Sequence, residues 1–185
     1  MEFLQQLWIP IVASAAILWV ASFFLHMVSP HHKGEWKGMP GEQGVVDAIT
    51  AAGLKPGQYW FPWGEMADMK NPEYMEKLKR GPNGTLVIWP GPVNMGRNLV
   101  LMLLFYLLAG VFVAYVSWYS LGAGSHPYLH VFRIAGATAV AAHCLGWMPN
   151  MIWFGGTTRC FWTYLFDGIV YGLLTAGTFG WLWLK

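Results

Sequence analysis

Charged residues are scarce in this chain: Asp, Glu, Lys and Arg make up only 11% of its 185 residues, whereas 56% are hydrophobic. A soluble domain carries about 25% charged residues, so this composition excludes an ordinary soluble protein. The formal net charge is only +2, and the basic residues of the main polar region alternate with acidic ones, which argues against nucleic-acid binding. The sequence therefore predicts an integral membrane protein surrounded by the lipid bilayer.

Cysteines and enzyme motifs are also nearly missing. Cys144 and Cys160 are the only two cysteines, and their predicted depths in the membrane differ by ~15 Å. A disulfide needs Cα atoms ~4.4–6.8 Å apart, so we expect two small apolar side chains instead. The sequence has no nucleophile elbow, Walker loop, dinucleotide-binding fingerprint or paired zinc motif. This absence favours a protein without catalytic activity, and the motifs identify no cofactor.

Four stretches are long and apolar enough to cross a hydrocarbon core, which takes ~20 residues in a helix. The first has no Lys or Arg before its apolar run and is longer than the core of a typical signal peptide, so we expect it to be retained. The stretches cover residues 7–28, 99–121, 131–154 and 161–184. They predict an all-α integral membrane protein with four transmembrane helices in a bundle.

Basic residues are concentrated on one side of these spans. Eight of the 11 Lys and Arg residues lie in the segment 30–97, and Arg159 lies in the short third loop. Lys and Arg next to a span resist translocation, so these loops are expected in the cytoplasm. The pattern predicts a multi-pass protein of the inner (cytoplasmic) membrane with both termini on the outer, periplasmic side.

The segment between the first two spans is predicted to fold as a small helical cap. One helical pattern covers residues 41–54 and ends at Gly53, and a second begins with Asn71 as N-cap and Pro72 in the first turn. Gly81 is expected to end the second helix. The chain thus divides into a first transmembrane helix (1–29), a cytoplasmic membrane-surface loop with two short helices (30–97), and the last three transmembrane helices (98–185).

Four aromatic residues crowd together between the two short helices. They are Tyr59, Trp60, Phe61 and Trp63. Such rings favour the headgroup region of a bilayer, so this loop is expected to lie against the membrane surface. A patch that binds a partner protein is the alternative.

Small residues recur along two of the predicted spans. Intervals of four in the last span, and of four and three in the third, form stripes that allow two helix backbones to approach closely. We expect helix packing along these stripes, and a kink of the third span near Pro149. The packing residues are Gly168, Gly172, Ala176 and Gly180 in the last span, and Gly136, Ala139 and Gly146 in the third.

Ionisable residues inside a bilayer cost ~2.5–3.5 kcal/mol each at the helix centre, so the few present are functional candidates: Asp167, His143, His26 and Arg133. The predicted depths of Asp167 and His143 differ by ~6 Å, so the two residues could form a pair that relays a proton or holds a polar ligand. The alternative is structural. Asp167 would then be satisfied by Arg159, Tyr171 or a backbone group, and His143 would fix the register between helices.

Histidine spacing argues against haem and against a metal ion. His26 and His143 differ in predicted depth by ~12 Å, whereas two axial histidines of a haem must lie at one level. His31, His32 and Glu35, in the stretch "HHKGE", resemble metal ligands in residue type, but no further ligand set is apparent. We therefore assign this stretch to the solvated surface and predict no metal site.

Three functions remain compatible with this sequence. The first is a non-catalytic accessory or assembly subunit of a larger membrane complex, because two small-residue stripes offer more packing surface than one short bundle needs. The second is a homo-oligomeric ion or small-solute transporter that uses the Asp167–His143 pair. The third is a pigment-, quinone- or haem-binding membrane protein. The expected partners are lipids, other membrane subunits or further copies of the chain, and no nucleic acid.

Overall fold

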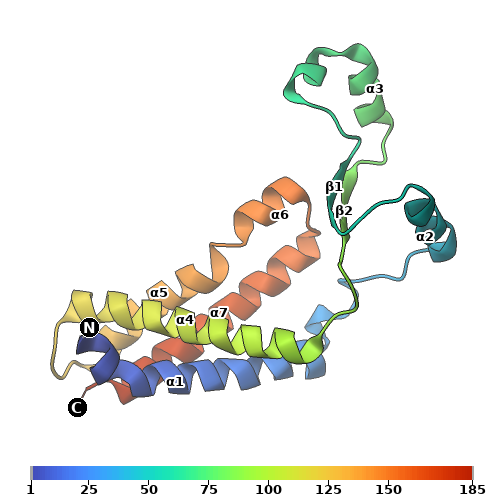
Figure 1. The fold of residues 1–185 in the computed structure, drawn as a ribbon. Coiled ribbons are helices and arrows are strands. Elements are labelled where there is room, and N and C mark those ends of the chain that lie inside the picture. Colours follow the sequence, from blue (N-terminus) through green and yellow to red (C-terminus); the bar gives the residue numbers. More distant parts are fainter. Residues whose placement is uncertain (1, 185) are drawn as a thin grey trace. The chain divides into compact units, whose positions relative to one another are not determined.

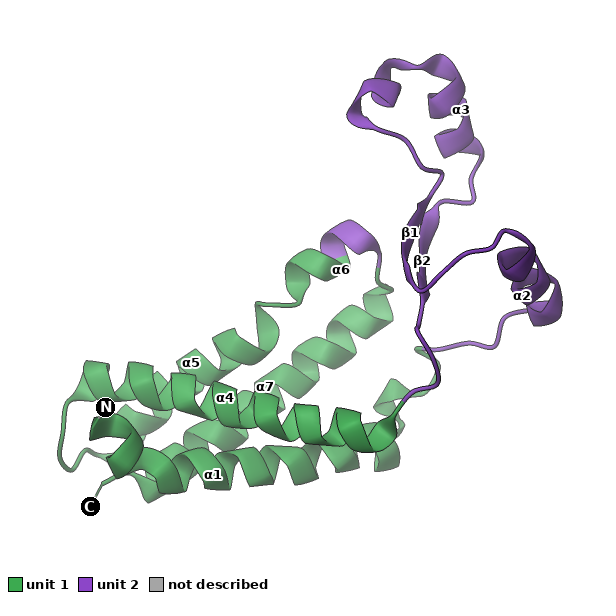
Figure 2. Cartoon of the chain, viewed as in Figure 1, with its two compact units in different colours: residues 1–35, 94–151, 156–185 green, residues 36–93, 152–155 purple. Residues whose placement is uncertain are grey.

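The computed structural model describes residues 2–184 and contains two compact units (Figure 1, Figure 2). The larger unit lies within residues 1–35, 94–151 and 156–185, and the smaller unit comprises residues 36–93 and 152–155. The larger unit is a helical bundle, whereas the smaller one combines short helices with a strand pair.

Four helical segments are long and apolar enough to cross a membrane, which confirms the predicted all-α membrane bundle. Each begins three to five residues before the corresponding predicted apolar stretch, because polar residues also join the helices, and none extends beyond the predicted end. The segments are formed by α1 (Glu2–Phe23) with the short η1 (Phe24–Val28), α4 (Met95–Leu121), α5 (Tyr128–Cys144) with α6 (Met148–Phe154), and α7 (Thr158–Leu182).

The third span is interrupted at the place where the sequence predicts a kink. α5 ends at Cys144 and α6 begins at Met148, directly before Pro149. Proline has no backbone N–H to donate, and its ring clashes with the preceding turn of a helix. It therefore occupies the first turn of a new helix, where the backbone nitrogen needs no hydrogen-bond partner.

Apolar side chains from all four spans fill the centre of the bundle. Leu7 of α1, Val113 of α4, Ala139 of α5 and Phe179 of α7 belong to one buried cluster. Phe3, at the beginning of α1, and Trp183, directly after α7, are part of the same cluster. The beginning of α1 and the end of α7 therefore lie at one end of the bundle (Figure 1).

The small residues of α7 lie against α5, and these two helices share the most extensive contact in the bundle. A Cβ atom added to Gly172 would overlap the Val140 side chain and lie 3.1 Å from the Val140 backbone nitrogen. A Cβ on Gly168 would lie 2.5 Å from Cys144 Sγ. The predicted packing residues Ala139 and Ala176 are fully buried, and a Cβ on Gly136 would meet Ala176, whereas Gly146 faces open space and Gly180 lies against Tyr128.

The smaller unit is built around a pair of antiparallel strands that the sequence analysis missed. β1 (Gly57–Phe61) pairs with β2 (Gly84–Ile88), with Tyr59 opposite Leu86. β1 contains three of the four aromatic residues treated above as a surface loop. Alternate strand residues point to opposite faces, so the crowding of rings in the sequence reflects a strand rather than an irregular segment.

Both predicted short helices of this unit are present. α2 spans Glu42–Ala51, and α3 spans Pro72–Arg80, after the one-turn helix η3 (Met66–Lys70). The Asn71 side chain accepts a hydrogen bond of 2.9 Å from the backbone of Glu73, as expected of an N-cap. Gly81 follows the helix with a φ of +64°, a conformation that favours glycine.

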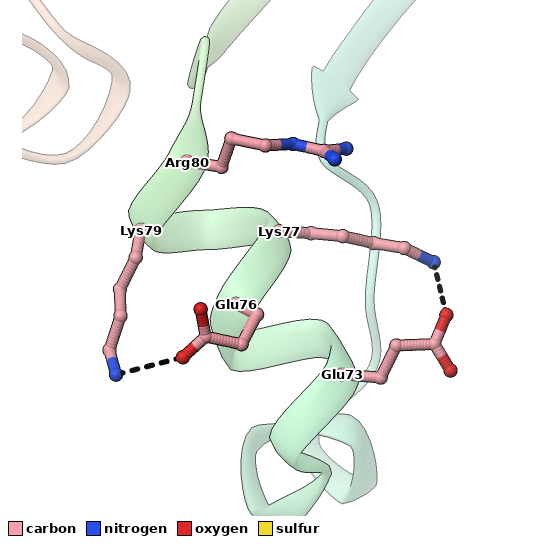
Figure 3. Close-up of a pocket in the computed structure, with 5 residues that line it drawn as sticks. All are labelled: Glu73, Glu76, Lys77, Lys79 and Arg80. Carbon is pink, nitrogen blue, oxygen red and sulfur yellow. Dashed lines mark hydrogen bonds and ion pairs between the residues drawn. The ribbon is translucent and has the colours of Figure 1, made fainter.

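The outer face of α3 carries a shallow hollow lined only by charged side chains (Figure 3). Lys77 pairs with Glu73 and Lys79 pairs with Glu76, each at 3.2 Å, while Arg80 extends away from both pairs. All four paired side chains are more than half exposed. Exposed pairs of this kind are worth ~0–1 kcal/mol, so this face is a solvated helix surface and is no candidate for a site.

Candidate metal centre

The first span ends in an unusual turn that brings a histidine to the end of the bundle. η1 is a π-helix, in which the Ser29 nitrogen donates to the Phe24 carbonyl at 2.9 Å. Such wider turns often occur at functional sites. Pro30 follows, and the residue before a proline is restricted to extended backbone, so the helix ends at Ser29. A short 3-10 turn, η2 (Pro30–His32), then places two more histidines beside α7.

Three histidines converge on the carboxylate of Asp167. His31 Nε2–H donates to Oδ1 at 2.8 Å, and His32 Nε2 lies 2.8 Å from Oδ2. His26 Nε2 lies 3.8 Å from the same Oδ2. Asp167 is only 2% exposed. A buried carboxylate is costly unless it is paired and hydrogen-bonded, and this one is satisfied by residues from the end of the first span and the turn after it.

The other ring nitrogen of each histidine is also occupied. His26 Nδ1–H donates to the Ser22 carbonyl at 3.0 Å, and His32 Nδ1–H donates to Glu35 Oε1 at 2.8 Å. His31 Nδ1 accepts from Ser29 Oγ at 2.6 Å. In a neutral imidazole one nitrogen donates and the other accepts. His26 and His32 can therefore present an Nε2 lone pair toward Asp167, while His31 presents a donor.

Glu35 is itself held in place by a second set of contacts. Its side chain is 3% exposed, and it accepts a short hydrogen bond from Thr163 of α7 as well as the bond from His32. Burial raises the pKa of Glu35, but its hydrogen bonds to Thr163 and His32 and the nearby positive charge of Arg159 outweigh burial, so the pKa lies below its ordinary value. Glu35 is therefore an anion that accepts hydrogen bonds from both neighbours.

Arg159 fixes the turn from the side of α7. Its guanidinium Nη2–H donates to the His31 carbonyl at 3.2 Å. The sequence analysis considered Arg159 as a direct partner of Asp167, but here it contacts the backbone of the histidine turn. This contact ties the backbone of η2 to the first turn of α7.

One ligand atom from each of His26, His32 and Asp167 lies within 4.8 Å of the others. Metal–ligand bonds of ~2.0–2.2 Å place neighbouring donor atoms ~3–3.5 Å apart. Asp167 Oδ2 and His32 Nε2 are already at about this spacing, and His26, whose side chain is 44% exposed, would move inward by ~1 Å. Two imidazoles and one carboxylate form a common donor set for Zn²⁺ and for non-haem Fe²⁺.

A cavity of about 280 Å³ adjoins this cluster inside the larger unit. His26 and Asp167 belong both to its lining and to the cluster. The rest of the lining comes from α4, from α7 and from the end of the third span, and it is mainly aromatic. These further residues are Met102, Phe105, Tyr106, His143, Trp147, Tyr164, Gly168 and Tyr171.

The four ionisable residues singled out from the sequence lie in different places. His143 and Asp167 line the same cavity, but the carboxylate of Asp167 accepts a hydrogen bond from His31 and lies 2.8 Å from His32 Nε2. The His143 ring packs edge-on to Phe105 and Tyr171, with centroids 5.9 and 5.6 Å apart. His26 belongs to both the cluster and the cavity, whereas Arg133 is exposed on α5 and lines neither.

Sequence reasoning missed His31, His32 and Glu35 as parts of this site. Adjacent histidines after a span look like solvated loop residues, and the depth of Asp167 was compared only with that of His143. A usable signal was present, because Glu35 follows His32 by three residues and a carboxylate at this spacing can hold a histidine ring. The contact itself was not predictable from local sequence, because His32 and Asp167 are 135 residues apart in the chain.

The chain matches no known protein family, no characterised protein and no solved structure. The functional evidence is the geometry of this cluster and of the cavity beside it.

Proposed function

We propose that this multi-pass membrane protein binds a first-row divalent transition-metal ion at the end of its helix bundle. His26 Nε2, His32 Nε2 and Asp167 Oδ2 are the ligands. The observation that carries the proposal is the outer contact of each ligand: Ser22 holds His26, Glu35 holds His32, and His31 holds the second oxygen of Asp167.

Such outer contacts are the usual support of metal ligands, because they fix the tautomer and the orientation of each ring. A histidine that served only to satisfy Asp167 would need one hydrogen bond to it and no partner on its far nitrogen. His26 does not hydrogen-bond Asp167 at all, since 3.8 Å is too long. Its orientation toward the carboxylate is accounted for if an ion lies between them.

The donor atoms favour particular metals. Imidazole nitrogens suit Zn²⁺, Fe²⁺, Co²⁺ and related ions, whereas Mg²⁺ and Ca²⁺ prefer oxygen ligands. Three protein ligands leave further coordination positions for water or another small ligand. The buried charge is also consistent with a cation, because Asp167 and Glu35 provide two carboxylates whose side chains are each only 3% exposed.

The test is metal titration of the purified protein after treatment with a chelator. Binding of Co²⁺, followed by its absorption bands, and of Zn²⁺ by competition should reach one ion per chain. We expect His32→Ala and Asp167→Ala to weaken binding at least ~100-fold, since each removes a ligand. His130→Ala, at an exposed position on α5, is the matched control and should bind as the unchanged protein does.

Two results would contradict the proposal. One is an unchanged protein that takes up no ion beyond the amount bound nonspecifically. The other is that His32→Ala and Asp167→Ala bind the ion as tightly as the control does. Their helical circular dichroism must match that of the unchanged protein, so that the comparison is between folded proteins.

We also propose that the protein resides in an inner membrane with both termini on the outer side, which puts the metal site at the cytoplasmic end. The support is the concentration of Lys and Arg in residues 30–97. A tag at either terminus should be removed by protease added outside spheroplasts. Protection of both tags would reverse this orientation and place the site on the outer side.

An accessory role in a larger membrane complex remains a prediction, as does a homo-oligomeric transporter. The first was argued partly from the small-residue stripes. Gly168 and Gly172 now lie against α5 of the same chain, so the α7 stripe no longer needs an outside partner. The transporter was argued from a pair formed by Asp167 and His143, but the close polar contacts of Asp167 are with His31 and His32.

A further inference from the structure

The cavity beside the metal ligands contains buried polar atoms without partners. Tyr106 and Tyr171 line it and are 1% and 7% exposed. Their hydroxyl groups lie near each other, and that of Tyr106 lies near Ser22, but neither has a partner in hydrogen-bond geometry within residues 2–184. The indole Nε1 of Trp147, also in the lining, is buried and equally unpartnered in that range. Buried polar groups are nearly always hydrogen-bonded, so three such atoms around one cavity indicate a ligand.

The shape and lining of the cavity restrict what that ligand can be. Its volume of about 280 Å³ is close to the lower limit of ligand sites, ~300–1,000 Å³, and suits a single ring. Phe105, Tyr106, Tyr164 and Tyr171 contribute aromatic rings to its lining, and such rings pack well on a flat ring. A Trp N–H can only donate and a Tyr O–H can donate, so the ring must carry hydrogen-bond acceptors, for which carbonyl oxygens are suited.

The cavity opens on the lipid-facing side of the bundle. Met102 and Phe105 line it, yet they are 41% and 45% exposed on α4, a helix of the membrane span. A ligand can therefore enter from the bilayer and leave an apolar tail among the lipid chains. A flat ring with two carbonyl acceptors and an apolar tail describes a membrane quinone.

We propose that this cavity binds the head group of a membrane-soluble quinone, with Tyr106, Tyr171 and Trp147 as hydrogen-bond donors to its carbonyl oxygens. The inference depends on the cavity and its unpartnered donors, and it does not require a bound metal ion. A phospholipid acyl chain would fill the apolar space but leave all three donors unsatisfied, and water would satisfy the donors but leave the aromatic rings wet.

The experiment measures quinone binding by the full-length protein in lipid nanodiscs that have been treated with a chelator. Immobilised nanodiscs are titrated with decylubiquinone, and the quinone retained above that of protein-free nanodiscs is measured by absorbance after extraction. Saturable binding of one quinone per chain is expected. Because the protein is metal-free throughout, failure of the metal proposal would not affect this result.

Two matched pairs of variants identify the donors. Tyr106→Phe and Tyr171→Phe each remove one hydroxyl and should weaken binding ~3- to 10-fold, the usual loss for one neutral hydrogen bond. Tyr115→Phe and Tyr119→Phe, at exposed positions on α4 outside the cavity, should not change it. These substitutions keep the aromatic ring, so the bundle should remain folded in all four variants.

The proposal is overturned if the protein nanodiscs retain no more quinone than the protein-free ones. It is also overturned if binding is saturable but equal in all four variants, since the quinone would then lie elsewhere on the bundle. Retention of a copurified phospholipid that decylubiquinone cannot displace would assign the cavity to lipid instead.

Discussion

The contact between α5 and α7 allows a quantitative prediction, because two glycines of α7 differ in what surrounds them. An added Cβ at Gly172 would lie 3.1 and 3.2 Å from the backbone nitrogen and Cα of Val140 and would overlap its side chain. An added Cβ at Gly177 would meet only the Tyr128 hydroxyl, at 3.8 Å, which is an ordinary contact. Gly172→Ala must therefore separate two helix backbones, whereas Gly177→Ala need not.

The magnitude follows from comparing the two variants. Both gain the same helix propensity, ~1 kcal/mol for Gly to Ala, so this contribution cancels in the difference. Insertion of a methyl group into a tightly packed contact costs ~1–3 kcal/mol. We expect Gly172→Ala to be less stable than Gly177→Ala by that amount. Gly177→Ala itself should match or exceed the unchanged protein.

The assay is reversible unfolding in mixed micelles, with the free energy of unfolding taken from the loss of helical circular dichroism. A lower midpoint for Gly172→Ala than for Gly177→Ala is the predicted result. Equal midpoints would refute the reasoning, because they would mean that α5 and α7 do not approach as closely at Gly172 as the structure has them.

Two further predictions concern the outer contacts of the metal ligands and the smaller unit. Glu35→Gln keeps the size of the side chain but removes the negative charge that accepts a hydrogen bond from His32, so the affinity for Zn²⁺ should fall ~10- to 100-fold. The control Glu42→Gln, at an exposed position on α2, should leave the affinity unchanged. Equal affinities of the two variants would show that Glu35 does not support the site. Asn71→Ala removes the N-cap of α3 and should cost ~1 kcal/mol, measured as faster hydrogen exchange of the α3 amides; unchanged exchange would show that the cap adds nothing.

The membrane bundle could be predicted from the sequence because its signals are local. Each span is a long, mainly apolar run, and Pro149 lies in the first turn of a new helix because of its own covalent geometry. Asn71 also acts locally in the smaller unit, where its side chain accepts a hydrogen bond from the backbone of Glu73. The strand pair was not predicted, because β1 is short and its partner β2 follows α3 in the chain, so no local pattern connects Gly57 with Ile88.

The candidate site could be predicted only in part. Asp167 and His26 were recognised, because an ionisable side chain in an apolar run is unusual in itself. His31, His32 and Glu35 were placed on the surface, since the sequence does not show that the turn at Ser29 and Pro30 folds back against α7. Their role arises from tertiary contacts, which the spacing of histidines along one segment does not encode.

The π turn that ends the first span makes the site dependent on chain length as well as on residue identity. A π turn holds about one residue more than the α turn it replaces. Deleting a residue between Phe24 and His26 would restore regular α geometry. The residues after the turn would keep about the same direction, because the turn would lose only its extra residue, but His26, inside the turn, would change its direction relative to His31 and His32. All the chemical groups of the cluster would still be present, but the three imidazoles would no longer share one direction. A related chain that lacks one residue in this turn would therefore contain the same histidines and carboxylates without bringing them together as a cluster.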